Sequence, residues 1–131
     1  MIRFPAFSAV ALVAGLFAAP VLAQAPVAMP AGNAAAGEKI FIQCKTCHVV
    51  DKGVNRVGPS LHGVVGRKAS TVPGYTYSAA NKKSGLTWTA PVLFKYLEAP
   101  QKMVPGTKMA FAGLKKPQDR ADVIAFLATK K

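Results

Sequence analysis

The sequence predicts an all-α fold in a single domain. Apolar residues recur at helical spacing over residues 90–98 and 117–129, and no stretch alternates apolar and polar residues as a half-buried strand does. The length of 131 residues suits one ordinary domain and is short for two. We therefore expect short helices joined by loops, without a β-sheet or an internal repeat.

The first 23 residues have the order of a secretory signal peptide. Arg3 gives a positive start, an apolar run follows from Ala6 to Ala19, and small or apolar residues precede Gln24. We predict cleavage after Ala23 and export to the periplasm. Retention as a membrane anchor is the alternative, although an apolar run of 14 residues is short for a spanning helix, which needs about 20.

A leader and the first helix should follow the signal. Residues 24–36 contain two prolines and no apolar period, so we predict a flexible leader there and a folded domain over 37–131. Asn33 is a candidate N-cap for structure that begins near Ala34. Four residues then recur at helical spacing, namely Gly37, Ile40, Phe41 and Cys44. The first helix should therefore lead directly to Cys44.

The segment Cys44-Lys45-Thr46-Cys47-His48 has the pattern that attaches a c-type haem. Each thiol can add across one haem vinyl group, and the imidazole of the next residue can reach the iron from one face of the ring. We predict one haem c, bound covalently through Cys44 and Cys47, with His48 as an iron ligand. Three alternatives are weaker. A disulfide would close a very small ring, a thioredoxin-like dithiol would accompany a βαβ pattern, and a structural zinc site needs four ligands.

After the haem motif, glycine and proline punctuate residues 51–77 without an apolar period, so loops are predicted there. A short helix is expected at 78–83 and a more regular one at 90–98, where Pro91 suits a first helical position. From Pro100 to Gly113 no regular element is expected.

The last helix is predicted over residues 117–129. Pro117 can occupy its first position, and Asp119 lies near the positive end of the helix dipole. Its buried stripe should consist of Val123, Phe126 and Leu127, with Ile124 beside it.

The charge of the chain indicates an anionic partner. Lysine and arginine number 17 against 5 acidic residues, and removal of Arg3 with the signal would leave 16. Such a surplus suits an acidic protein, an acidic membrane or nucleic acid. Nucleic acid is the weakest of these, because the lysines are scattered and an exported protein seldom meets it.

The residues alone leave three candidates for the second iron ligand, which are His62, Met103 and Met109. Methionine is often a gap-filler in cores. Met109 nevertheless follows Pro105-Gly106, a pair that fits a type II turn, so its thioether can be aimed at the cofactor. A thioether and an imidazole together raise the reduction potential and leave no open coordination position. That pair favours electron transfer over oxygen or peroxide chemistry.

Further segments extend the pattern beyond the haem motif. They are Gly58–Gly63, Gly66–Lys68, Gly74–Tyr77, Asn81, Leu86–Trp88, Tyr96–Leu97, Pro105–Gly113 and Asp122–Leu127. From about Gly37 to the C-terminus the chain resembles class I cytochrome c of the mitochondrial and bacterial cytochrome c2 type. The resemblance implies that the N- and C-terminal helices cross, with short helices and loops wrapped around one covalently attached haem. Gly37 and Phe41 would then meet Val123 and Phe126.

The resemblance also implies roles for the residues around the haem. It assigns Met109 as the iron ligand opposite His48. The carbonyl of Pro59 would accept a hydrogen bond from His48 and fix its ring. The other expected haem contacts are Arg67, Tyr77 and Trp88 near a propionate, Asn81, Tyr96 and Thr107 near Met109, and Phe111 at the exposed haem edge.

The function that the resemblance implies is a soluble, monomeric carrier of single electrons between membrane-bound redox complexes. A bc1-type complex, a terminal oxidase, a reductase or a photosynthetic reaction centre would present an acidic patch to lysines around the haem edge. The candidate docking lysines are Lys45, Lys102, Lys108, Lys115 and Lys116. Three positions depart from the family's usual pattern. Gln43 and Gln101 stand where a lysine is common, and Met103 stands where an aromatic residue is frequent. Fewer lysines would therefore surround the haem edge.

Two alternatives remain for the function. A membrane-anchored carrier would retain residues 1–23. A small haem peroxidase would need an open or releasable iron position.

Overall fold

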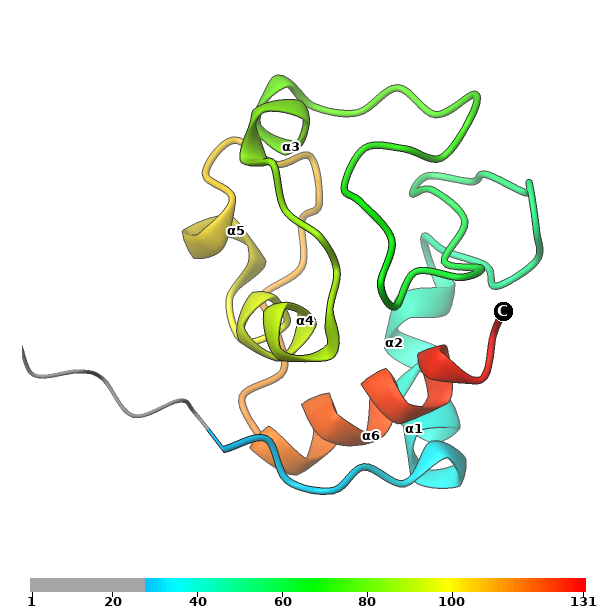
Figure 1. Cartoon of the computed structure of the whole chain (residues 1–131), viewed down its shortest axis with the longest axis vertical. Helices are drawn as coiled ribbons and strands as arrows, with labels where there is room; N and C mark the ends of the chain where they lie inside the picture. Colours follow the sequence, from blue (N-terminus) through cyan, green and yellow to red (C-terminus); the bar gives the residue numbers. More distant parts are fainter. Residues whose placement is uncertain (1–27) are drawn as a thin grey trace, which may run out of the picture.

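The computed structural model describes residues 28–131 (Figure 1). The helices in this range are α1 (Ala34–Ile40), α2 (Ile42–Lys45), α3 (Ala79–Ser84), α4 (Ala90–Tyr96), α5 (Pro100–Met103) and α6 (Pro117–Ala128). No strand occurs between residues 28 and 131, where an isolated antiparallel bridge joins Lys68 to Thr87. The all-α prediction is confirmed. The predicted signal peptide, residues 1–23, lies outside the described residues.

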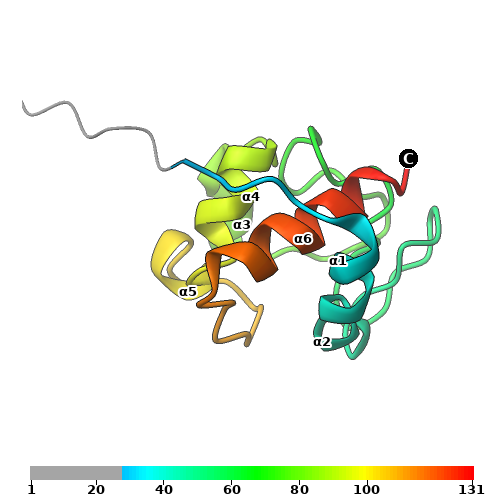
Figure 2. The same cartoon turned by 90° about the horizontal axis from the view of Figure 1, so that it is seen from below.

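Helices α1 and α6 pack across each other and so join the two ends of the domain (Figure 2). Gly37 lies so close to α6 that a Cβ built on it would overlap the carbonyl of Asp122. One turn later the rings of Phe41 and Phe126 are in contact, with centroids 5.1 Å apart. Both rings are almost completely buried, and such burial stabilises the fold by about 2–3 kcal/mol for each side chain. The predicted crossing of the terminal helices is confirmed.

The last helix follows its prediction closely. Pro117 lies in the first turn of α6 together with Asp119, and the helix ends at Ala128, one residue earlier than predicted. The residues of the predicted stripe are all buried, namely Val123, Ile124, Phe126 and Leu127.

The first helix begins where the candidate N-cap predicts. Helix α1 starts at Ala34, because the side chain of Asn33 accepts a hydrogen bond from the Ala36 N–H at 3.0 Å. The last three residues of the predicted leader, residues 24–36, lie in the first turn of α1.

Residues 28–33 run beside α6 and make specific contacts with it (Figure 2). The Asn33 N–H donates to Asp122 Oδ1 at 2.7 Å, and Gln118 Nε2 donates to the carbonyl of Ala31 at 2.8 Å. These contacts depend on side chains about 90 positions further along the chain. Local composition therefore gave no sign of them.

Side-chain caps explain where α3 and α4 begin. Ser78 Oγ accepts from the Asn81 N–H at 3.1 Å, and Thr89 Oγ1 accepts from the Val92 N–H at 3.4 Å. Helix α3 ends at Ser84 and is capped by Gly85, which adopts a left-handed conformation with φ of 63°. Both helices lie near their predicted positions.

Helix α5 lies where no regular element was expected. It is a single turn in which the Val104 N–H donates to the carbonyl of Pro100 at 2.9 Å. A single turn is too short to show an apolar period, which is why the sequence pattern missed it. Within residues 28–131, none of the helices combines the length and the apolar character that crossing a membrane requires.

Candidate haem-binding site

The cysteine pair lies where α2 ends. Cys44 is on α2 and Cys47 is in the turn that follows, where the N–H groups of Cys47 and His48 donate to the Cys44 carbonyl at 3.1 and 2.9 Å. Both thiols are free and half-buried, without the disulfide considered above. Burial raises the pKa of the Cys44 thiol to about 11. This turn thus brings two free thiols and one imidazole into five consecutive residues.

The ring of His48 is fixed at one nitrogen and along one face. Its Nδ1 lies 2.8 Å from the carbonyl oxygen of Pro59, which is the predicted hydrogen bond. A carbonyl oxygen can only accept, so Nδ1 carries the proton and Nε2 keeps the lone pair that can bind iron. Gly58 packs under the ring, and a Cβ built there would overlap it.

The surroundings of His48 favour the neutral imidazole. Burial lowers its pKa, the hydrogen bond to Pro59 raises it by a smaller amount, and the positive charge of Arg67 lowers it again. The net direction is downward. The neutral form is the one that binds a metal ion.

Met109 lies in the distal segment, residues 104–116, which joins α5 to α6. Tyr96 Oη donates a hydrogen bond to Met109 Sδ at 3.3 Å, and the Met109 N–H donates to Thr107 Oγ1 at 3.2 Å. Tyr96 projects from α4 into the core, where burial raises the pKa of its hydroxyl and a hydrogen bond with Thr107 lowers it by less. The thioether of Met109 is therefore oriented by a buried, protonated tyrosine.

The other two ligand candidates have different surroundings. Met103 is half-buried on α5 and packs against the hydrophobic core as Met109 does, but its sulfur accepts no hydrogen bond within residues 28–131. His62 is half-buried in a loop, where its N–H donates to Ser60 Oγ at 3.2 Å and its carbonyl accepts from Arg67 at 2.6 Å. In Figure 1 the distal segment lies beside α4 and α5, whereas α2 lies on the opposite side of the domain.

Arg67 and Trp88 form one polar and aromatic wall. The Arg67 guanidinium donates to the carbonyls of His62 and Ser60 at 2.6 and 3.0 Å. The backbone N–H of Trp88 donates to the Arg67 carbonyl at 2.8 Å. Burial lowers the pKa of Arg67, and Tyr77 opposes this shift. The Trp88 ring contacts the ring of Tyr96 with centroids 4.6 Å apart, so this wall continues to the residue that orients Met109.

Two buried side-chain oxygens near these residues lack a hydrogen-bond partner within the described part of the chain, Asn81 Oδ1 and Ser70 Oγ. Within residues 28–131, Ser70 is also a non-glycine residue with a positive φ, at 63°. Buried polar groups nearly always have a partner. A haem fits this surrounding, because its carboxylates can accept from a hydroxyl such as that of Ser70, and ordered water around them can donate to an amide oxygen such as Asn81 Oδ1. The free thiols and the available Nε2 of His48 fit it as well.

A structural zinc site has no support in residues 28–131. Within this range no three histidine, cysteine, aspartate or glutamate side chains come close enough to hold a metal ion. The zinc alternative therefore lacks its ligands in the part of the chain that the structure describes.

The five predicted docking lysines are all exposed, but they are not equivalent. Lys108 Nζ donates to the carbonyl of Thr76 and lies 5.6 Å from the centre of the Tyr75 ring. Lys115 Nζ donates to the carbonyl of Glu98, which follows α4, and to the carbonyl of Ala112 in its own segment. The ammonium groups of Lys45, Lys102 and Lys116 make no hydrogen bond or ion pair within residues 28–131.

Phe111 is half-buried in the distal segment. It lines a surface hollow of about 400 Å³ together with Pro100, Lys102 and Lys115. An apolar side chain thus lies beside two positive charges on the outer side of the distal segment.

Sequence reasoning missed the roles of Gly58 and Ser70. The position of Gly58 directly before Pro59 was a usable signal, because a glycine allows the backbone to approach the ring of His48 closely. For Ser70 there was no signal, because a serine in a loop gives no indication of its backbone conformation.

Comparisons with known proteins point to one family. The family model for cytochrome c matches residues 34–131. Cytochrome c2 of Rhodopila globiformis is 56% identical over 103 residues, which cover 78% of this chain and 97% of that protein. Cytochrome c type-1 of Ascaris suum is 52% identical over 100 residues, 76% of this chain and 89% of that protein. Among solved structures, cytochrome cH from Methylobacterium extorquens has a TM-score of 0.72 and 54% identity, and the match covers 76% of this chain and all of that one.

Proposed function

Since this chain belongs to the cytochrome c family, we propose that it carries single electrons between membrane-bound redox complexes through a haem held between His48 and Met109. The family binds haem c covalently, and Cys44 and Cys47 are the attachment residues of this chain. The bound haem supplies an iron that alternates between the ferrous and ferric states.

The His48 side of the proposed site depends on one hydrogen bond. Because Nδ1 donates to the Pro59 carbonyl at 2.8 Å, Nε2 is the nitrogen available to the iron. That hydrogen bond also orients the ring and raises the basicity of Nε2.

The observation that carries the proposal is the hydrogen bond from Tyr96 Oη to Met109 Sδ at 3.3 Å. It favours Met109 over Met103 and His62, because a thioether that is held in place by a buried hydroxyl loses little further freedom on binding iron. A thioether opposite an imidazole leaves no open position for substrate, which suits a carrier better than a peroxidase.

Electrons would leave through the haem edge near Phe111. The lysines beside it, Lys102 and Lys115, lie in the same surface hollow, and they would attract the acidic patch of a partner. Lys45, Lys108 and Lys116 are the other proposed docking residues. The expected partners are a bc1-type complex, a terminal oxidase, a reductase or a photosynthetic reaction centre. The chain would bind each of them as a monomer.

A periplasmic location follows from the predicted signal peptide and completes the proposal. Its test is the intact mass of the native protein. A chain that starts at Gln24 supports export with cleavage, whereas an intact N-terminus supports a membrane-anchored carrier.

The experiment that tests the carrier function is a redox titration of the holoprotein combined with a peroxide assay. We expect a reversible one-electron titration, slow peroxide turnover, and a haem c spectrum that persists in alkaline pyridine after denaturation. Rapid peroxide turnover by the unmodified holoprotein would instead identify an enzyme. A colourless mature protein would contradict the covalent haem.

A further inference from the structure

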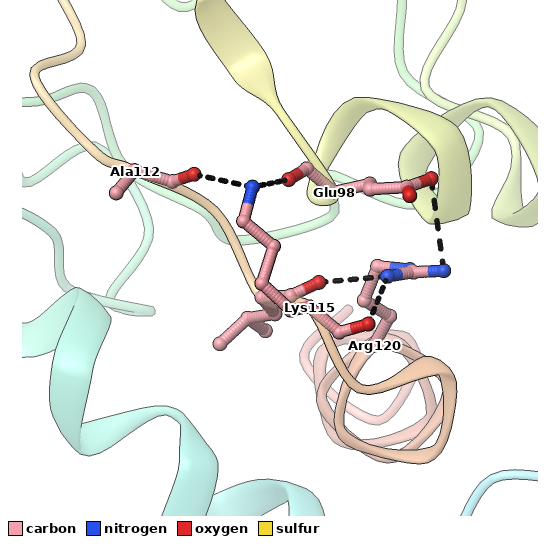
Figure 3. A network of polar contacts seen from close by, with 5 residues as sticks. Glu98, Ala112, Lys115 and Arg120 are labelled. Carbon is pink, nitrogen blue, oxygen red and sulfur yellow. Dashed lines mark hydrogen bonds and ion pairs between the residues drawn. The ribbon is translucent and has the colours of Figure 1, made fainter.

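The end of the distal segment is held against α4 and α6 by two basic side chains (Figure 3). Lys115 Nζ donates to the carbonyl of Glu98 at 2.8 Å and to the carbonyl of Ala112 at 3.1 Å. Glu98 follows α4, whereas Ala112 is three residues after Met109. One ammonium group therefore joins the distal segment to the element that carries Tyr96.

Arg120 makes the second set of contacts from α6. Its Nη1 donates to the carbonyls of Leu114 and Lys115 at 2.7 and 3.1 Å, and its Nη2 pairs with Glu98 Oε2 at 3.8 Å (Figure 3). The guanidinium also lies 4.4 Å from the centre of the Phe94 ring. Because Arg120 is only 4% exposed, these contacts join the distal segment to the core of the domain.

Backbone contacts bring the same residues close to α4. The Leu114 N–H donates to the Leu97 carbonyl at 2.7 Å. Gly113, with φ of +96°, packs against the carbonyl of Glu98 so closely that a Cβ would overlap it. An opening of the distal segment that moves residues 112–114 away from the core must therefore break their contacts with the end of α4.

We propose that Lys115 is a positioning residue that keeps the distal segment closed, and that it thereby limits the access of small external ligands to the iron. This inference rests on the proposed ligand Met109. The Lys115 hydrogen bond to Glu98 spans the contact that opening would break, since Glu98 lies at the end of α4. The bond to Ala112 stays within the distal segment and ties residue 112 to the same ammonium group. Charge-assisted bonds to carbonyls are stronger than neutral ones, so their loss favours the open state. Lys115 thus differs from the docking lysines whose ammonium groups have no partner in residues 28–131.

The first test is imidazole binding to the ferric holoprotein of Lys115→Met, with Lys116→Met as the matched control. Each variant removes one exposed lysine, and only Lys115 makes the bonds in Figure 3. We expect about five- to tenfold tighter imidazole binding for Lys115→Met and less than about twofold for Lys116→Met. Lys115→Arg should bind imidazole about as weakly as the parent protein does, because a guanidinium can donate to the same carbonyls.

The second test measures opening without reference to the iron ligand. Exchange of the Leu114 amide, which donates to Leu97, should accelerate about five- to tenfold in Lys115→Met, whereas amides in the middle of α6 should exchange at the parent rate. Equal acceleration of both would show a general loss of stability and overturn the proposal. Identical Leu114 exchange in the two methionine variants would also overturn it.

The two tests separate this inference from the proposed function. If Met109 is not the iron ligand, Met109→Ala leaves the ferric spectrum unchanged and the proposed ligation fails. The exchange of the Leu114 amide still decides the role of Lys115 in that case, because it reports opening of the distal segment directly.

Discussion

The two proposed iron ligands are held in contrasting ways. His48 directly follows the attachment cysteines, and the groups that fix its ring, Gly58 and Pro59, are only ten and eleven residues further on. Met109 lies in a segment without regular structure, and Tyr96 and Lys115 connect that segment to α4.

This difference predicts different behaviour on the two sides of the haem. The His48 side combines covalent attachment with close packing, so a change there should disturb the whole fold. The Met109 side is closed by a few hydrogen bonds of about 1 kcal/mol each, so changes there should alter ligand access and potential while the domain stays folded. The variants below test this contrast from the largest effect to the smallest.

The largest effect is expected for Gly58→Ala on the His48 side. The added Cβ would overlap the imidazole of His48, and moving either group breaks the contact with Pro59. We expect a loss of about 3 kcal/mol in the free energy of unfolding, as for overpacking in a core. Denaturant titration of the holoprotein measures it.

Gly53→Ala is the control for that variant. Gly53 has φ of 74° and nothing within 4 Å of a built Cβ, so backbone strain alone should cost about 1 kcal/mol. Equal losses for the two glycines would mean that close packing under the His48 ring contributes nothing.

A smaller effect is expected for Tyr96→Phe on the Met109 side. The hydroxyl draws electron density from the sulfur, and this favours the ferrous state, because ferric iron depends more on donation from its ligands. Removal of the hydroxyl should therefore lower the midpoint potential. A hydrogen bond of about 0.5–1.5 kcal/mol corresponds to about 20–60 mV for one electron.

Tyr75→Phe is the matched control for the potential, since the Tyr75 hydroxyl donates to the Val57 carbonyl at 2.9 Å and not to Met109. It should shift the midpoint potential by less than Tyr96→Phe does. A potential that is unchanged or higher in Tyr96→Phe would contradict the proposed hydrogen bond to an iron ligand. Cyclic voltammetry of the three holoproteins gives the comparison.

The smallest effects are expected for single docking lysines, one from each side. Lys45 lies on α2 and Lys102 on α5, and both ammonium groups have no partner within residues 28–131. Lys45→Gln and Lys102→Gln should each slow reaction with an acidic redox partner by about twofold at low salt. Stopped-flow kinetics should show the difference vanish near 1 M salt, where the Debye length is about 3 Å. A loss that persists at high salt would contradict electrostatic steering.

The same contrast explains what the sequence could predict. His48 and the two cysteines form a local motif, so five consecutive residues were sufficient to propose His48 as an iron ligand. The ends of helix α6 were predicted to within one residue, because apolar residues recur at helical spacing along its twelve residues. Both results depend on neighbours in the chain.

Contacts between distant residues were outside the reach of pattern reasoning. The choice among Met109, Met103 and His62 needed either the family resemblance or the Tyr96 contact, which joins residues 13 positions apart. The two carbonyls bound by Lys115 could not be inferred, because backbone carbonyls leave no mark in a sequence. The same holds for the contacts of residues 28–33 with α6 and for the single turn of α5.

The most direct test of the account is the ferric spectrum of Met109→Ala beside that of Met103→Ala. Each variant removes one half-buried thioether from the same region, and only Met109 is bound by Tyr96. We predict that the thioether-to-iron band of the ferric holoprotein is lost in Met109→Ala and retained in Met103→Ala. A band that survives in Met109→Ala, or one that disappears in Met103→Ala alone, would contradict the closed His48 and Met109 coordination.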